Sequence, residues 1–210
     1  MESENIPRIK LIFLGDVGVG KSSIMTRYLR DSFSDNYQAT IGLDFILRTI
    51  KIKNKEYNLA FYDTAGQEKF RSLIPMYIRD AKIILLVYDI TKKESFDNLN
   101  IWLESLKDIK EDIILYIVGN KSDMKKERQV LKEEGKKFAK EKNFGFKEVS
   151  AKTGDGIKEL FEIKIINEIK HKMKIEGAEK NIIENNIKEN NIELKKGEEM
   201  KNNEKKFCCF

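Results

Sequence analysis

Short apolar runs alternate with amphipathic stretches over most of the chain. Four runs are continuous and short, and they cover residues 8–14, 83–88, 113–118 and 144–149. Such runs are typical of strands that are buried on both faces of a parallel sheet. Other stretches carry apolar side chains at helical spacing, in residues 21–30, 94–108, 131–142 and from about 155 to 173. The pattern therefore predicts strands that alternate with helices.

A different pattern lies between the first run and the second. Residues 45–53 and 57–61 alternate between apolar and polar side chains on either side of a short turn at residues 54–55. This alternation predicts an antiparallel hairpin at a sheet edge. Together the patterns predict an α/β fold: a doubly wound, mostly parallel six-stranded sheet with one antiparallel edge strand.

The periodic pattern ends near residue 174. Residues 176–206 are dominated by Glu, Lys and Asn, with scattered Ile and no aromatic residue. Such a segment buries too little apolar surface to offset the entropy of ordering, so we expect it to be flexible. The sequence thus predicts one folded domain over residues 1–173 and a tail over residues 174–210. The Ile spacing around residues 182–187 leaves a transient helix open.

Composition narrows the possible functions. The chain has 40 basic and 35 acidic residues, which argues against the one-sided basic face that a nucleic-acid partner usually needs. No stretch approaches the ~18 uninterrupted apolar residues of a membrane span, and the N-terminus is too short and polar for a signal peptide. We therefore expect a cytosolic protein. The two cysteines, Cys208 and Cys209, are adjacent and do not make a disulfide framework.

A phosphate-binding loop is the strongest motif. Residues 15–22 read Gly-Asp-Val-Gly-Val-Gly-Lys-Ser, match G-x-x-x-x-G-K-[ST], and lie between a predicted strand and a predicted helix. Backbone N–H groups are expected to point at the phosphates, with Lys21 near the β- and γ-phosphates and the Ser22 hydroxyl on Mg²⁺. The predicted nucleotide contacts are Asp16, Val17, Gly18, Val19, Gly20, Lys21, Ser22 and Ser23. The loop does not distinguish ATP from GTP, and the alternative is an ordinary glycine-rich turn.

A second group of residues is expected to recognise the nucleotide base. Asn120-Lys121-Ser122-Asp123 follows an apolar run, so it faces the crevice at the carboxyl ends of the strands. The Asp123 carboxylate can accept two hydrogen bonds from the N1–H and amino group of guanine, which adenine does not offer. Ser150-Ala151-Lys152 follows another strand, and we expect it to supply a backbone N–H to the guanine carbonyl oxygen. Taken alone, Asn-Lys-x-Asp also fits a polar surface loop.

A third motif, Asp63-Thr64-Ala65-Gly66-Gln67, ends the second hairpin strand. We expect Asp63 to hold Mg²⁺ through a water, Gly66 to offer its N–H to the γ-phosphate, and Gln67 to orient the attacking water. Thr40 is the expected second hydroxyl ligand of Mg²⁺, in a polar segment suited to a loop that orders with the γ-phosphate. Phe33 either stacks on the base edge or is a core residue that ends the first helix.

These motifs, in this order, resemble the Ras superfamily over residues 8 to about 172. Within it the chain is similar to Rab proteins in residues 41–45, 69–73, 77–81 and 86–91. Residues 71–80 resemble the Rab branch that acts at the Golgi. The resemblance implies a monomeric switch in vesicle traffic that hydrolyses GTP to GDP with Mg²⁺.

The resemblance also implies partners and a location. The GTP-bound form recruits effectors at the cytoplasmic face of a membrane, and the GDP-bound form joins a cytosolic pool held by a dissociation inhibitor. An exchange factor, an activating protein and a prenylating enzyme with its escort protein are the other implied partners. Phe45, Tyr62 and Tyr77 are the implied aromatic trio that meets effectors, although most Rabs carry tryptophan in place of Tyr62.

Hydrolysis is expected to be slow without an activating protein. Val17 occupies a position where Rabs usually have a smaller or polar residue. Two other functions stay open. One is a GTP-binding scaffold that hydrolyses too slowly to time anything, and the other is a kinase or ATPase with the same phosphate-binding loop.

The C-terminal sequence Phe207-Cys208-Cys209-Phe210 resembles the double-cysteine endings of Rabs, in which both thiols carry geranylgeranyl groups. It is not a C-a-a-X box, because the fourth-last residue is Phe207. Residues 172–206 contain nine Lys and eight Glu, so the tail lacks the polybasic patch that attracts anionic lipid. We therefore expect the membrane anchor to be two lipid chains, on Cys208 and Cys209.

Overall fold

The structure is a computed structural model, and it describes residues 6–35, 43–52, 55–64, 74–107 and 113–172. The chain divides into two units, Met1–Glu168 and Ile169–Phe210. The sheet and the site residues discussed below belong to the first unit. Of the second unit, the described part is the helical stretch 169–172.

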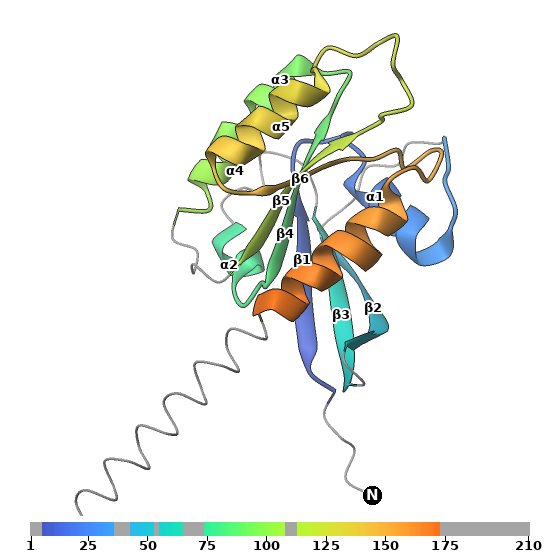
Figure 1. Cartoon of the computed structure of the whole chain (residues 1–210), viewed down its shortest axis with the longest axis vertical. Coiled ribbons are helices and arrows are strands. Elements are labelled where there is room, and N and C mark those ends of the chain that lie inside the picture. The colour runs from blue at the N-terminus through green and yellow to red at the C-terminus, as the bar shows by residue number, and fades with distance from the viewer. Residues whose placement is uncertain (1–5, 36–42, 53–54, 65–73, 108–112, 173–210) are drawn as a thin grey trace, which may run out of the picture. The chain divides into compact units, whose positions relative to one another are not determined.

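A six-stranded sheet forms the centre of the first unit (Figure 1). The strand bounds are Arg8–Leu14 for β1, Leu43–Ile52 for β2, Lys55–Thr64 for β3, Ile83–Asp89 for β4, Ile114–Asn120 for β5 and Gly145–Glu148 for β6. Their order in the sheet is β2-β3-β1-β4-β5-β6. All neighbouring pairs are parallel except β2 and β3, which form an antiparallel hairpin at the edge. The predicted α/β fold is therefore confirmed.

Helices cover both faces of this sheet (Figure 1). Their bounds are Lys21–Arg30 for α1, Ile74–Ile78 for α2, Lys93–Asp97 for α3, Leu99–Glu104 for α4 and Lys132–Glu141 for α5. The last helix begins at residue 157 and contains a π-helical segment, η2, over Glu159–Ile165. Within the described ranges, no helix is long and apolar enough to cross a membrane.

Two helices differ from the sequence prediction. The stretch 94–108, predicted as one helix, is divided into α3 and α4 at Asn98, whose side-chain amide donates to Asp16 Oδ2 at 2.7 Å. In η2 the wider π turn takes up an extra residue. In this helix Ile163 is 55% exposed, while Phe161 is fully buried. Helical periodicity alone does not detect either feature.

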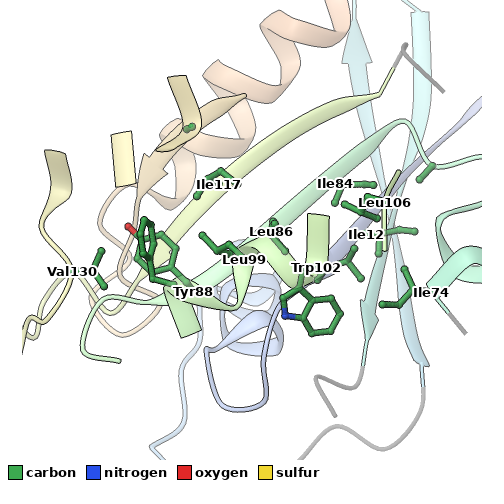
Figure 2. Packing of buried hydrophobic residues seen from close by; sticks show 14 of the residues in the cluster. Ile12, Ile74, Ile84, Leu86, Tyr88, Leu99, Trp102, Leu106, Ile117 and Val130 are labelled. Atoms are coloured by element: carbon green, nitrogen blue, oxygen red, sulfur yellow. The ribbon is translucent and has the colours of Figure 1, made fainter. Parts of the chain in front are cut away.

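Alternation along β1 divides the core into two clusters. On one face, the Phe13 ring lies near the Phe61 and Phe161 rings, with centroids 6.5 and 6.4 Å apart. Tyr28 of α1 stacks on Phe161 at 4.2 Å. On the other face, Ile12 belongs to a cluster that includes residues of α2, α3, α4 and α5 (Figure 2). The two clusters fix the parallel strands, so their carboxyl ends meet at one edge of the sheet.

The aromatic cluster predicts a large difference between two positions in η2. Phe161→Ala should lower the free energy of unfolding by about 3–5 kcal/mol, because it removes a fully buried ring. The matched control Ile163→Ala should change it by less than about 0.5 kcal/mol, because this side chain is exposed. Urea unfolding followed by circular dichroism measures both. A larger loss for Ile163→Ala would show that the helix is wound in another register.

Candidate functional site

The phosphate-binding loop connects β1 to α1 and packs closely against two other strands. Gly15 and Gly20 have φ values of 135° and 94°, a region that favours glycine. A Cβ atom on Gly15 would lie 2.2 Å from the Val87 carbonyl oxygen of β4. One on Gly20 would lie 2.3 Å from Asn120 Nδ2 at the end of β5. Glycine at these two positions therefore lets the loop backbone approach β4 and β5.

Lys21, Ser22 and Asp63 come together at the start of α1. Lys21 is 5% exposed, and its Nζ donates to the carbonyl oxygens of Gly15 and Asp16, both at 2.9 Å. Ser22 Oγ donates to Asp63 Oδ2 at 2.5 Å. One buried cation and two oxygen atoms that could bind a metal ion therefore lie together beside the loop.

The charge of Lys21 is poorly solvated. Burial lowers the pKa of Lys21 from its ordinary value to about 8, and the negative charges of Asp63 and Asp16 offset only part of this effect. A phosphate placed beside the side chain would raise the pKa again, because an opposite charge favours the protonated form. An anion beside Lys21 would therefore stabilise the charged form of this side chain.

Asn120 joins the phosphate-binding loop to the segment after β6. Its Nδ2 donates to the Val19 carbonyl oxygen at 2.8 Å, and its Oδ1 accepts from the Ala151 N–H at 3.2 Å. The side chain is 2% exposed, so both bonds are shielded from water. Arg27 of α1 adds two bonds that the sequence analysis missed, from Nε to the Ala151 carbonyl oxygen and from Nη2 to that of Lys152, at 2.8 and 2.7 Å.

Lys121 is held by a carboxylate that the sequence analysis also missed. Its Nζ lies 2.6 Å from Asp89 Oδ2, and Asp89 is fully buried. The other oxygen, Asp89 Oδ1, accepts from the backbone N–H and the hydroxyl of Thr91 at 2.9 and 2.7 Å. The sequence could have indicated this role of Asp89, because the residue ends the apolar run of β4 as Asn120 ends that of β5, and the two residues pair in register.

Asp123 and Ser150 form the next pair. Ser150 Oγ donates to Asp123 Oδ1 at 2.6 Å and accepts from the Thr153 N–H at 3.0 Å. Ser150 is fully buried, whereas Asp123 is exposed to solvent. The carboxylate is therefore oriented by a buried hydroxyl and open to a ligand.

For the other predicted site residues, the structure gives a position in the chain or an exposure, or does not describe them. Val17 is 47% exposed. Phe33 lies beyond the end of α1 and is half-buried, so it does not end that helix as a core residue. Gly18 lies in the loop, and Ser23 lies in the first turn of α1. Outside the described residues lie Thr40, Gly66, Gln67, Cys208 and Cys209.

An aromatic surface lies on the β2–β3 hairpin. Phe45 is 49% exposed and stacks on Tyr62 with ring centroids 5.6 Å apart. Lys10 Nζ lies 4.8 Å from the centre of the Tyr62 ring and donates to the Arg79 carbonyl oxygen at 2.9 Å, just beyond α2. Tyr77 lies within α2 and is half-buried. The three predicted aromatic residues therefore come from β2, β3 and α2.

Residues 10–171 match the model of the Ras family. The match covers well over half of the 210 residues. It includes the phosphate-binding loop, the segments after β5 and β6, and the aromatic surface. The match and the geometry point to the same ligand, a guanine nucleotide.

The low pKa of Lys21 predicts that nucleotide affinity falls in mildly alkaline solution. Above a pH of about 8 the free protein loses the Lys21 proton and must regain it when the nucleotide binds. Affinity should therefore be complete below that pH and drop roughly fivefold over the next pH unit. Isothermal titration calorimetry in buffers of different ionisation enthalpy measures the affinity and the proton uptake.

Lys21→Arg is the control for this prediction, because a guanidinium keeps its proton throughout the same range. The variant should bind nucleotide without proton uptake. If its affinity falls with pH as the wild type does, Lys21 is not the source.

Proposed function

This chain belongs to the Ras family, and we propose that it acts as a Rab-type switch in vesicle traffic. Family membership makes it a small GTPase, which binds guanine nucleotides and alternates between GTP and GDP forms. The observation that carries the nucleotide-binding part of the proposal is the Asn120 bridge, because it sets the base-binding and phosphate-binding segments at a fixed separation. A kinase or ATPase does not need a carboxylate such as Asp123 beside the base.

Base recognition is proposed to rest on the two segments that the buried polar groups hold in place. Asp123 would accept from the N1–H and amino group of guanine, and its orientation is supported by the bond from Ser150. The segment 150–152 would supply a backbone N–H to the guanine carbonyl oxygen. Lys121 would be kept beside the base by its ion pair with Asp89.

Mg²⁺ is the proposed cofactor, and the donor set fits it. Mg²⁺ prefers oxygen ligands, and Ser22 Oγ and Asp63 Oδ2 lie 2.5 Å apart. Ser22 would bind the ion, Asp63 would hold one of its waters, and Thr40 would be the second hydroxyl ligand. When bound, the ion neutralises negative charge on the β- and γ-phosphates. Lys21 adds a fixed positive charge beside the same loop.

Hydrolysis is proposed to follow attack of a water on the γ-phosphate, with GDP as the leaving group. Gln67 would orient the water and the Gly66 N–H would bind the γ-phosphate. We expect slow turnover without an activating protein, because the β-branched Val17 stands in the loop where Gln67 and a partner's group must act. Single-turnover hydrolysis, with and without an activating protein, separates the switch from a GTP-binding scaffold.

The proposed partners and location follow from the proposed assignment to the Rab proteins. This assignment is supported by the sequence similarity of residues 41–45 and 71–80 and by the Phe45–Tyr62 stack, in which the exposed Phe45 ring offers an aromatic contact of the kind that protein partners bind. Effectors would bind there at the cytoplasmic face of a Golgi membrane. An exchange factor and an activating protein would drive the cycle, and a dissociation inhibitor would hold the GDP form in the cytosol.

Nucleotide selectivity tests the function. The full-length protein with Mg²⁺ should bind GTP and GDP in preference to ATP. Asp123→Asn should weaken GTP binding and favour xanthine nucleotide, because each buried group left unpaired costs about 1–3 kcal/mol. Competition against labelled GDP measures both changes. The neighbouring Ser122→Ala is the matched control, and wild-type GTP affinity in Asp123→Asn would disprove the assignment of the base pocket.

We propose that the chain consists of a GTP-binding domain over residues 1–173 and a tail over residues 174–210. Attachment of this tail to membranes tests the Rab part of the proposal. One lipid chain gives only marginal, reversible membrane binding, so stable anchoring takes two signals. A prenylating enzyme and its escort protein would modify Cys208 and Cys209. Cys208→Ser or Cys209→Ser alone should give a partly cytosolic protein, and the double change a fully cytosolic one. Fractionation of cells that express the N-terminally tagged protein measures the distribution.

Nucleotide binding is the control, since it should survive all three cysteine variants. A double variant that stays in the membrane pellet would exclude these cysteines as the anchor.

A further inference from the structure

The Asp16 carboxylate is bound by two side chains from the α3–α4 region. Its Oδ2 accepts from Asn98 Nδ2 at 2.7 Å, and its Oδ1 accepts from Trp102 Nε1 at 2.8 Å. The donors lie 82 and 86 residues away in the sequence. Asn98 lies at the junction of α3 and α4, and Trp102 lies in α4. These bonds are therefore a tertiary connection between the phosphate-binding loop and the two helices.

A carboxylate at this position works against the proposed ligand unless it is held aside. Asp16 follows Gly15 in the loop, and its own carbonyl oxygen accepts from Lys21 Nζ. A free carboxylate here would repel a polyphosphate, since like charges at short range disfavour each other. Both of its oxygens accept from neutral donors, and hydrogen bonds to an ionised acceptor are the stronger kind. The side chain of Asp16 is therefore suited to hold the loop rather than to bind the nucleotide.

Trp102 extends this connection into the core. It is 2% exposed and belongs to the same cluster as Ile12 of β1 and Ile74 of α2. Figure 2 shows the indole beside these residues, with its six-membered ring on the Ile74 side and its nitrogen on the opposite side in this view. One rigid side chain thus bonds the loop through its N–H and belongs to this apolar cluster through its ring.

We propose that Asp16 is a positioning residue that fastens the phosphate-binding loop to α3 and α4 through Trp102 and Asn98, and that this link sets the lifetime of the bound nucleotide. The proposal rests on the proposed function, in which the loop holds a guanine nucleotide. When either partner is lost, the loop keeps its sequence and its lysine but loses its attachment to the helices, so the nucleotide leaves faster.

Release of a fluorescent GDP analogue from the full-length protein with Mg²⁺ is the test. Trp102→Phe keeps an aromatic ring but removes the N–H donor together with the five-membered ring of the indole, and Asp16→Ala removes the acceptor without changing the buried ring. Each should speed release roughly five- to thirtyfold, the size expected for part of a hydrogen bond to a charged group. Ile101→Ala is the matched control, because Ile101 is the exposed neighbour of Trp102 on α4. It should release GDP at the wild-type rate.

Two further readouts separate a link from a general loss of stability. Asp16→Ala combined with Trp102→Phe should release GDP at about the rate of Asp16→Ala alone, because that variant already lacks the bonds from both Asn98 and Trp102. Trp102 is the only tryptophan in the chain, so its emission reports this position alone. Removal of the nucleotide should change the emission of the wild type and leave that of Asp16→Ala unchanged. If Asp16→Ala does not fold, Asn98→Ala replaces it.

Three outcomes would overturn the link. Trp102→Phe and Ile101→Ala would release GDP at the same rate, or the effects of the two single changes would multiply in the double variant. Alternatively, Asp16→Ala would slow release while Trp102→Phe speeds it, which would make the carboxylate only a repelling charge. A wild type that binds no labelled GDP would instead disprove the proposed function, and the link with it.

Discussion

The two hydrogen bonds of the buried Asn120 side chain are the interaction on which the site depends. β1 and β5 are not neighbours, because β4 lies between them, so the phosphate-binding loop and the β5 end meet only across the end of β4. The Asn120 amide spans this gap, since it offers a donor to Val19 and an acceptor to Ala151. The contact requires glycine at position 20, where a Cβ atom would overlap Asn120 Nδ2. An aspartate at position 120 would lack the donor and leave the Val19 carbonyl oxygen unpaired in a buried place.

The burial of charged groups at one edge of the sheet is the second constraint. A buried charge without a partner is costly, and among the described residues this edge of the sheet carries three buried charged groups, Lys21, Asp63 and Asp89. Asp89 pairs with Lys121. The hydrogen bonds of Lys21 to described residues go to two carbonyl oxygens, and its pKa stays lowered despite the negative charges of Asp63 and Asp16. The charge of Asp89 is therefore balanced by an ion pair, while the charge of Lys21 is balanced only in part.

The sequence predicted the strands and the phosphate-binding loop well, because both depend on local patterns. Apolar runs and a fixed spacing of glycine, lysine and serine need no knowledge of distant residues. The division of the helix at Asn98, the π turn in η2 and the roles of Asp89 and Arg27 could not be read in the same way. Asn98, Arg27 and Asp89 have partners far along the chain, namely Asp16, the Ala151 carbonyl oxygen and Lys121. The π turn leaves the apolar stripe of its helix in place, so the sequence pattern does not reveal it. Of these features, the role of Asp89 was the easiest to predict from the sequence, because the residue ends an apolar run as Asn120 does.

The aromatic surface and the magnesium ligand expected from the sequence are neighbours on β3. Side chains alternate along a strand, so Asp63 faces Ser22 of α1 while Tyr62 faces Phe45, its partner across the hairpin. Any shift of β3 therefore moves both side chains together. Lys10 holds the Tyr62 ring from another side and binds the carbonyl oxygen just beyond α2, which adds that helix to the connection. Tyrosine combines an apolar ring with a phenolic hydroxyl. The surface therefore offers a hydrogen-bonding group as well as apolar area.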